Sequence, residues 1–172
     1  MHNSNEASQH WYAVHTRSRH EFQVQERLQL KGVVSFLPSV EKLRKWKDRK
    51  KLVAFPLFPG YIFVRIENNP HSMLNVLKVK GVVRVICNIP GEPAPIPDDQ
   101  IASLQKLVEN REALDPYPYL NEGQKVRIAK GPLSGVEGIL VEKLEKHILV
   151  LSVDVLRQGV ALTINAADVE RI

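Results

Sequence analysis

The sequence predicts an α+β protein: an α/β sandwich, with helices packed on one mixed sheet, followed by a small SH3-like β-barrel. Up to about residue 110, strand-type and helix-type patterns alternate, which favours helices packed on one sheet. Pro116-Tyr117-Pro118 suits neither a helix nor a central strand and predicts a linker. After it, short β-type runs between Gly-rich or charged turns are typical of a small barrel. The predicted division is a flexible tail (1–10), a first domain (11–110), a linker (111–120) and a second domain (121–172).

Local patterns predict the first elements of the sandwich. The aromatic and β-branched run Trp11–His15 predicts a strand. Ser18 and Glu21 have the S-x-x-E spacing of a helix capping box, and the helix is expected to end at Gly32, because glycine readily takes the left-handed cap conformation. Residues 33–37 then predict a second strand.

The middle of the first domain is expected to contain a hairpin and a central strand. The segment 42–51 is too charged to be buried and separates two extended stretches, which predicts a hairpin tip. The alternating run that follows predicts a strand with Ile62, Val64 and Ile66 on one face and Tyr61, Phe63 and Arg65 on the other.

Two helices and a short strand complete the first domain. A helix is expected at about residues 70–77, ending near Gly81, followed by a strand at 82–86. Pro90, Pro93, Pro95 and Pro97 should then break regular structure. Asp98 and Asp99 are good helix-start residues and open a helix whose inward face holds Ile101, Leu104 and Leu107 or Val108.

The second domain is expected to contain five short strands. They are Lys125–Ala129, Gly138–Val141, His147–Val153, Gly159–Ile164 and Val169–Ile172. Leu140, Leu144, Ile148 and Leu151 also fall at helical spacing, so a strand-to-helix switch is an alternative. β-branched residues and the glycines of this region favour the barrel.

Composition excludes several classes of protein. Of the 172 residues 44% are hydrophobic and 25% charged, and no apolar run approaches the roughly 20 residues of a membrane span. The polar start, Met1 to His10, does not resemble a secretion signal. Cys87 is the only cysteine, which excludes an internal disulfide and a multi-cysteine metal site. A cytoplasmic protein without a membrane partner is therefore expected.

Residue types that carry enzyme chemistry are not arranged for it. The six histidines show no metal-ligand spacing, and no Gly-rich phosphate loop is present. Cys87 has no evident histidine partner near it. The sequence predicts a non-enzymatic protein with no metal and no cofactor.

Basic charge is concentrated in the first third of the chain. The net charge is +5; residues 1–65 carry 12 Lys and Arg against five Asp and Glu, whereas residues 66–172 carry 12 against 14. Such asymmetry often marks a nucleic-acid face. The hairpin tip combines phosphate-directed charge with one stacking ring, and the candidate nucleic-acid residues are Arg44, Lys45, Trp46, Lys47 and Arg49. The alternative is a solvated tip without a ligand.

The segment from Gly123 to Gly138 resembles the KOW motif of transcription elongation factors and some ribosomal proteins. It combines an alternating strand, a tight Gly-Pro turn and a glycine that admits the next strand closely. The turn consists of Gly131, Pro132, Leu133, Ser134 and Gly135, with Leu133 where the motif usually has an aromatic residue. The alternative is that these glycines only close a barrel.

Trp11 to Val14 and Pro56 to Val64 resemble the amino-terminal (NGN) domain of the NusG family. With the KOW motif, the similarity covers nearly the whole chain in the right order. Arg17, the basic hairpin around Trp46 and the segment Pro56 to Val64 resemble most closely the specialised RfaH and UpxY type of paralogue, which acts on selected operons such as those for surface polysaccharides.

The resemblance implies a monomeric transcription elongation or antitermination factor. Such a protein packs an apolar patch onto the clamp helices of the largest subunit of bacterial RNA polymerase and reduces pausing and termination, and its KOW domain contacts a small-subunit ribosomal protein or the termination factor Rho. By position the patch consists of His15, Phe58, Pro59, Tyr61 and Phe63. Aromatic residues are the type that anchors interfaces. The alternative is that the three rings lie in the core of the domain.

The resemblance also implies a surface that contacts non-template or upstream DNA. The second candidate surface lies at the start and along one side of the first helix and consists of Arg17, Arg19, His20, Gln23 and Arg27. Arg and Gln can read base edges, although a helix start also favours polar residues. The chain departs from RfaH at Ser72-Met73-Leu74, where that protein contacts the other pincer of the polymerase, and at Phe55, where RfaH has an acidic residue that locks its domains. Autoinhibition of that kind is therefore not expected.

A stand-alone RNA-binding or ribosome-associated KOW protein is the alternative function, because KOW domains and basic α/β sandwiches both occur in that setting. It predicts affinity for bare RNA without polymerase. The polymerase hypothesis predicts the reverse.

Overall fold

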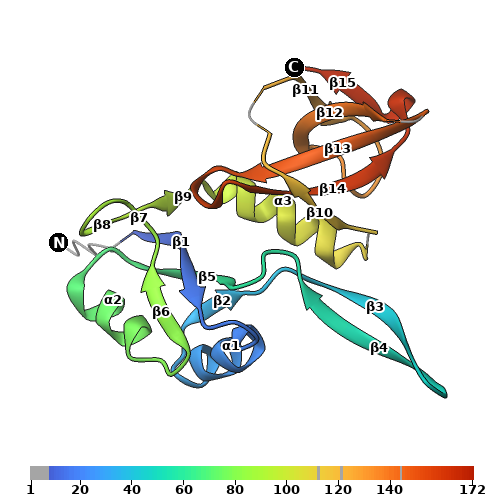
Figure 1. The fold of residues 1–172 in the computed structure, drawn as a ribbon. Helices are drawn as coiled ribbons and strands as arrows, with labels where there is room; N and C mark the ends of the chain where they lie inside the picture. The colour runs from blue at the N-terminus through green and yellow to red at the C-terminus, as the bar shows by residue number, and fades with distance from the viewer. Residues whose placement is uncertain (1–7, 112, 121, 144) are drawn as a thin grey trace. The chain divides into compact units, whose positions relative to one another are not determined.

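The computed structural model describes residues 8–111, 113–120, 122–143 and 145–172, and Figure 1 shows its elements. The described residues form two compact units. Unit 1 contains residues up to Leu37 and residues 59–98, and unit 2 contains residues 38–58 and 99–172. The predicted domain boundaries concern segments that fold on their own, and they stay a prediction.

Unit 1 is built on an antiparallel sheet. Its strands, in spatial order, are β2 (Val34–Phe36), β5 (Tyr61–Glu67), β1 (Gln9–Thr16) and β6 (Val82–Val85), and β9 (Pro95–Ile96) also pairs with β1. The expected sheet was a mixed one, whereas every pairing among these described strands is antiparallel. The reason is that β1 and β2, which are joined by a helix, run in the same direction but are separated by β5.

Helices α1 (Glu21–Leu30) and α2 (Pro70–Leu77) share a core with this sheet. The core takes Ile62, Val64 and Ile66 from β5, which confirms the predicted alternation. Its other buried members are Tyr12, Val14, Val24, Leu28, Leu37, Val76, Val79 and Val85. Burial of these apolar side chains stabilises the unit. Each large aliphatic side chain that is fully buried contributes roughly 1.5–3 kcal/mol. The register of β1 with β5 places Trp11, His15, Tyr61 and Phe63 on the opposite face of the two strands.

The predicted capping box at the start of α1 is not formed. The N-cap is His20, which makes no side-chain cap hydrogen bond. Arg19 has a left-handed backbone with φ of +63°, so the helix begins two residues too late for Ser18 to be its cap. The carboxylate of Glu21 instead accepts a hydrogen bond from the Gly60 N–H at 2.8 Å.

The remaining elements of unit 1 follow the prediction at α2 and differ from it after β6. The span of α2 is the predicted one, and Asn69 caps it by accepting a hydrogen bond from the Ser72 N–H at 2.8 Å. The proline-rich stretch contains short strands where breaks in regular structure are expected: β7 (Cys87–Ile89) pairs with β8 (Glu92–Pro93), and β9 pairs with β1. Pairing with a strand far away in the sequence overrides the local effect of proline here.

Unit 2 contains a hairpin, a helix and a β-domain. Strands β3 (Ser39–Trp46) and β4 (Arg49–Pro56) form the predicted hairpin, drawn in Figure 1 as a long two-stranded ribbon. Helix α3 (Asp98–Glu109) begins at the predicted residue and buries Ile101, Leu104 and Leu107. Its last three turns belong to unit 2, while Asp98 is grouped with unit 1.

The β-domain is one antiparallel sheet of six strands, the predicted small barrel. Its order is β10 (Asp115–Pro118), β14 (Gln158–Ile164), β13 (Lys146–Val153), β12 (Glu137–Lys143), β11 (Gln124–Ile128) and β15 (Val169–Arg171), and two 3₁₀ turns lie at Asp154–Leu156 and Ala166–Asp168. The five predicted strands are confirmed to within two residues at each end. Strand β10 lies inside the predicted linker; its prolines are tolerated because it is an edge strand.

The alternative helical pattern falls on β12 and β13. Leu140, Ile148 and Leu151 lie in strands, and Leu144 is outside the described residues. A strand-to-helix switch would require a second conformation in which these residues are helical, and it stays a prediction.

Ionisation of Tyr12 is expected to destabilise unit 1 at alkaline pH. Burial raises the pKa of its hydroxyl above the ordinary 10.0, so the folded state favours the neutral phenol. This stabilisation is complete below pH 10.0 and is lost as the pH rises through the raised pKa of the folded state. We expect the urea midpoint of the wild type to fall more steeply above this pH than that of Tyr12→Phe. Parallel curves for the two proteins would contradict the prediction.

Candidate functional site

One end of the unit 1 sheet carries a cluster of rings. His15 of β1 and Tyr61 of β5 are register partners, and their ring centroids are 5.3 Å apart with planes tilted by 33°. Both side chains are half-buried, and Pro59 beside them is exposed. Among the described residues the Nδ1 atom of His15 is buried without a hydrogen-bond partner. Three of the five predicted patch residues therefore lie together in unit 1.

Gly60, between Pro59 and Tyr61, is held from both sides. Its N–H donates to Oε1 of Glu21 and its carbonyl accepts from the Thr16 N–H, each at 2.8 Å. The residue has φ of +83°, a conformation that favours glycine, and a Cβ here would lie 3.7 Å from the His15 ring. Glu21 is only 5% exposed. Sequence reasoning missed this role, because a glutamate at a helix start carries no signal for a backbone partner 39 residues away.

The other two patch residues are buried. Phe58, grouped with unit 2, and Phe63, in unit 1, are both fully buried. Phe63 stacks on its register partner Phe36, with ring centroids 6.2 Å apart and planes at 28°. For Phe63 this is the alternative of a ring in the core. The binding role of all five residues stays a prediction.

The register of the hairpin separates its basic residues onto two faces. Directly opposed residues share a face, and Trp46 opposes Arg49 while Arg44 opposes Lys51. We call these four residues the tryptophan face. On the other side Lys45 opposes Lys50 and Leu43 opposes Leu52, and we call these four the leucine face. All eight residues are exposed, and the predicted site residue Lys47 lies in the turn.

Two contacts organise the tryptophan face. The guanidinium of Arg44 lies 4.9 Å from the centroid of the Phe55 ring, a cation–π geometry. Lys42, next on the same side of β3, forms an ion pair with Asp115 at 2.6 Å. Phe55 therefore supports a basic residue here, and Lys42 is paired with an acidic residue of unit 2.

The second basic surface, at the start of α1, is only partly open. Arg17, Arg19 and Gln23 are exposed. His20 is half-buried with its Nδ1 2.9 Å from the Ser18 carbonyl, and Arg27 donates to the Lys80 carbonyl at 2.6 Å. The structure thus places the five predicted residues together at one helix, with two of them engaged in contacts to backbone carbonyls.

The turn predicted from the KOW motif is present between β11 and β12. Gly131 and Gly135 have φ of +82° and +90°, and the Gly135 N–H donates to the Ile128 carbonyl at 2.8 Å. Pro132 and Ser134 are exposed, whereas Leu133 is buried. The residue that replaces the usual aromatic therefore contributes to the barrel interior rather than to the surface.

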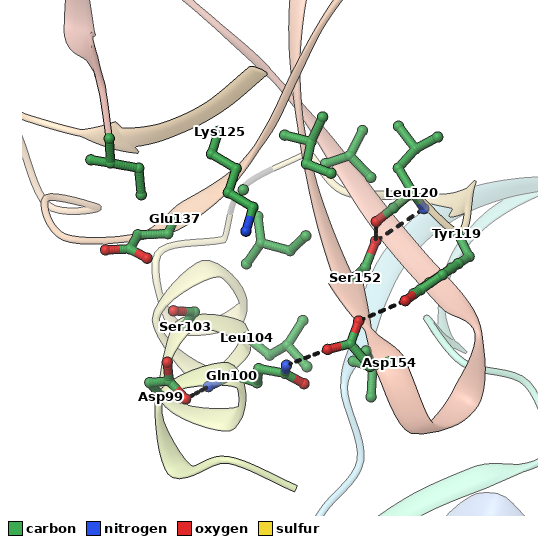
Figure 2. Close-up of a pocket in the computed structure, with 16 residues that line it drawn as sticks. Asp99, Gln100, Ser103, Leu104, Tyr119, Leu120, Lys125, Glu137, Ser152 and Asp154 are labelled. Atoms are coloured by element: carbon green, nitrogen blue, oxygen red, sulfur yellow. Dashed lines mark hydrogen bonds between the residues drawn. The ribbon is translucent and has the colours of Figure 1, made fainter. Parts of the chain in front are cut away.

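A cavity of about 420 Å³ lies within unit 2, lined by α3 and by strands of the barrel. Figure 2 shows three of its polar side chains turned toward one another: Asp154 accepts hydrogen bonds from the Tyr119 hydroxyl at 2.9 Å and the Gln100 amide at 3.1 Å. Ser152 donates to the Leu120 carbonyl at 2.8 Å. These groups satisfy each other and present no arrangement of nucleophile and base.

The described residues contain neither a cluster suited to a metal ion nor a helix that could span a membrane. No group of three or more His, Cys, Asp or Glu side chains converges there. Every helix in that part of the chain is too short or too polar to cross a bilayer.

Comparison with known proteins identifies the family. Residues 9–105 match the family model NusG, described as transcription termination factor nusG. The chain belongs to the NusG family. The transcription termination/antitermination protein NusG of Pseudomonas aeruginosa is 25% identical over 94% of this chain and 98% of that protein. Its counterpart from Borreliella burgdorferi is 26% identical over 96% of this chain and all of that protein.

A solved structure supports the fold over nearly the whole chain. The structure titled "Domain interaction in Thermotoga maritima NusG" superposes with a TM-score of 0.55 and covers 96% of this chain and 98% of its own, at 23% identity. The predicted family and α+β fold are therefore confirmed. This NusG-family chain is a transcription termination/antitermination factor, not an enzyme.

Proposed function

We propose that this NusG-family protein binds the clamp helices of the largest subunit of bacterial RNA polymerase and suppresses pausing or termination on selected operons. The observation that carries the proposal is the ring pair His15–Tyr61 beside exposed Pro59. Partly exposed aromatic rings are the side chains that most often anchor interfaces.

The five patch residues divide by exposure into two roles. Pro59, Tyr61 and His15 are accessible enough to contact the polymerase. Phe58 and Phe63 are fully buried, so their role is to support the residues beside them in the chain. Removing a buried phenylalanine costs about 3–5 kcal/mol, and for this reason Phe58→Ala tests folding more than binding.

The basic surfaces are proposed to contact upstream or non-template DNA of the elongation complex. Exposed Arg17, Arg19 and Gln23 at the start of α1 are suited to phosphates and base edges. The hairpin adds exposed charge around Trp46. The barrel is proposed to contact a small-subunit ribosomal protein or Rho, as the KOW resemblance implies.

The proposal is tested by binding to purified elongation complexes. Tyr61→Ala is expected to weaken binding about tenfold, equivalent to about 1.4 kcal/mol, because it removes one ring of the exposed pair. Pro59→Ala, at an exposed position, provides a second test that does not threaten the fold. Leu30→Ala is the matched control, because Leu30 is an exposed apolar residue at the opposite end of α1 from Glu21.

The affinity of the wild type for a polymerase that lacks the clamp helices should be no higher than the affinity of Tyr61→Ala for the intact polymerase. Unchanged binding of Tyr61→Ala and Pro59→Ala, or full binding to the clamp-deleted polymerase, would refute the proposal. Tight binding to bare RNA without any dependence on polymerase would support the RNA-binding alternative instead.

A further inference from the structure

The tryptophan face has the composition of a platform for an unpaired nucleic-acid strand. Trp46 is 79% exposed, and its register partner is Arg49. Arg44 and Lys51 form the next pair on the same face, two residues along each strand, which is about 7 Å. A large ring is thus bordered by three cations on one side of a two-stranded ribbon.

The exposed indole indicates which form of nucleic acid fits. Lysine and arginine alone suffice to bind the phosphates of a duplex. In a duplex the faces of the bases are stacked on one another, so an indole cannot reach them. An unpaired strand offers free base faces, and stacking on aromatic rings is the usual way in which proteins bind it.

Two neighbouring contacts restrict the Arg44 side chain and pair Lys42 with an acidic residue. The Phe55 ring holds the Arg44 guanidinium at 4.9 Å, which reduces the conformational freedom that this side chain loses on binding. Lys42, the next basic residue of β3 on this side, is paired with Asp115. The free charges of this face therefore gather near the hairpin tip, around the indole.

The leucine face lacks these features. Its two lysines, Lys45 and Lys50, oppose each other without an aromatic ring beside them, and its other pair is Leu43 and Leu52. Both leucines are exposed. The two faces thus carry the same hairpin backbone but different chemistry, which makes one the internal control for the other.

We propose that the tryptophan face binds an unpaired polynucleotide strand, with Trp46 stacked on a base and Arg44, Arg49 and Lys51 on flanking phosphates, and that the leucine face takes no part. This deepens the proposed nucleic-acid contact of the elongation factor and rests on it. Of the basic hairpin residues predicted from the sequence, Lys45 is thereby excluded from the site.

The intrinsic fluorescence of the full chain provides the first test. The chain has two tryptophans; Trp11 is 6% exposed and Trp46 is 79% exposed. Titration with a short oligo-dT or oligo-U strand is expected to quench Trp46 saturably, whereas a duplex of equal phosphate number should bind at least about tenfold more weakly. Trp46→Phe leaves only Trp11, whose emission should not change. A preference for dT or for U identifies DNA or RNA as the source, and either agrees with the proposal.

Two double variants with equal loss of charge provide the second test. Arg44→Ala with Lys51→Ala is expected to weaken oligonucleotide binding about tenfold and to reduce the slope of log affinity against log salt by about 1.4, because each phosphate contact on a single strand contributes about 0.7. Lys45→Ala with Lys50→Ala should change the affinity less than about threefold, as expected of charges that do not touch the strand. Trp46→Ala should cost about tenfold.

Three outcomes overturn the inference: no quenching of Trp46, equal affinity for duplex and single strand, or equal effects of the two double variants. Polymerase binding is measured in parallel with Tyr61→Ala, which should keep full oligonucleotide affinity. If the wild type does not bind the oligonucleotide but still binds polymerase through the clamp helices, only the platform is rejected. Intact oligonucleotide binding without clamp dependence rejects only the polymerase proposal.

Discussion

Replacing Gly138 with alanine is expected to lower the free energy of unfolding of the barrel by about 3 kcal/mol, at the upper end of overpacking costs. Gly138 lies in β12, where a Cβ atom would be 2.6 Å from the Val150 carbonyl oxygen and 3.0 Å from Leu149 Cδ1. The first of these is a backbone atom of the neighbouring strand, so it cannot move without separating β12 from β13. The glycine that the KOW motif places here is needed for this close approach.

The measurement is urea unfolding followed by far-UV circular dichroism, together with amide exchange of β12, β13 and β14. Tryptophan fluorescence does not report on the barrel, because Trp11 and Trp46 both lie outside it. Gly159→Ala is the graded control: its Cβ would lie 3.1 Å from the Leu151 carbonyl oxygen, and its effect should be clearly smaller. A wild-type unfolding curve for Gly138→Ala, or a larger effect at Gly159, would contradict the prediction.

Replacing Glu21 with alanine is expected to cost about 2 kcal/mol, because it leaves the Gly60 N–H without its acceptor. The same change should weaken clamp-dependent polymerase binding, since Gly60 joins Pro59 to Tyr61 and its position sets theirs. Glu21 is a positioning residue in this argument and does not itself contact the polymerase. Its buried carboxylate connects the start of α1 with the turn before β5.

Amide exchange of Gly60, followed by nuclear magnetic resonance, separates this role from a general loss of stability. Glu21→Ala should accelerate exchange at Gly60 while the neighbouring Thr16 amide, which donates to the Gly60 carbonyl, keeps partial protection. Glu21→Gln retains a side-chain oxygen acceptor and should restore most of the protection. Equal protection of Gly60 in wild type and Glu21→Ala would show that the hydrogen bond has no positioning role.

Much of the fold can be predicted from the sequence wherever local residue patterns, such as the alternation of core-facing residues in a strand, decide the structure. In β5 the residues Ile62, Val64 and Ile66 face the core as their alternation predicts, and α2 begins at Pro70 beside its Asn69 cap. Local patterns fail where a distant partner decides the structure. Strand β9 exists because it pairs with β1, and the prolines around it predict the opposite.

Less of the candidate site can be predicted, because it depends on register and on contacts between distant residues. The residue types at the hairpin tip are visible in the sequence, but their division between two faces requires the position of the turn after Trp46. The proximity of His15 and Tyr61 follows only from the pairing of β1 with β5. The buried position of Phe63 follows from its stacking on Phe36, which alternation alone does not distinguish from an exposed ring.

Strand β10 also protects one edge of the barrel sheet from pairing with a strand of another molecule. A proline fits a strand only where its nitrogen faces away from the neighbouring strand, so Pro116 and Pro118, opposite Val160 and Gln158 of β14, place two nitrogens without hydrogen atoms on the outer edge. A further chain seeking to extend the sheet there would find too few donors to pair with. At high concentration this edge should therefore resist the strand-to-strand association that seeds aggregates.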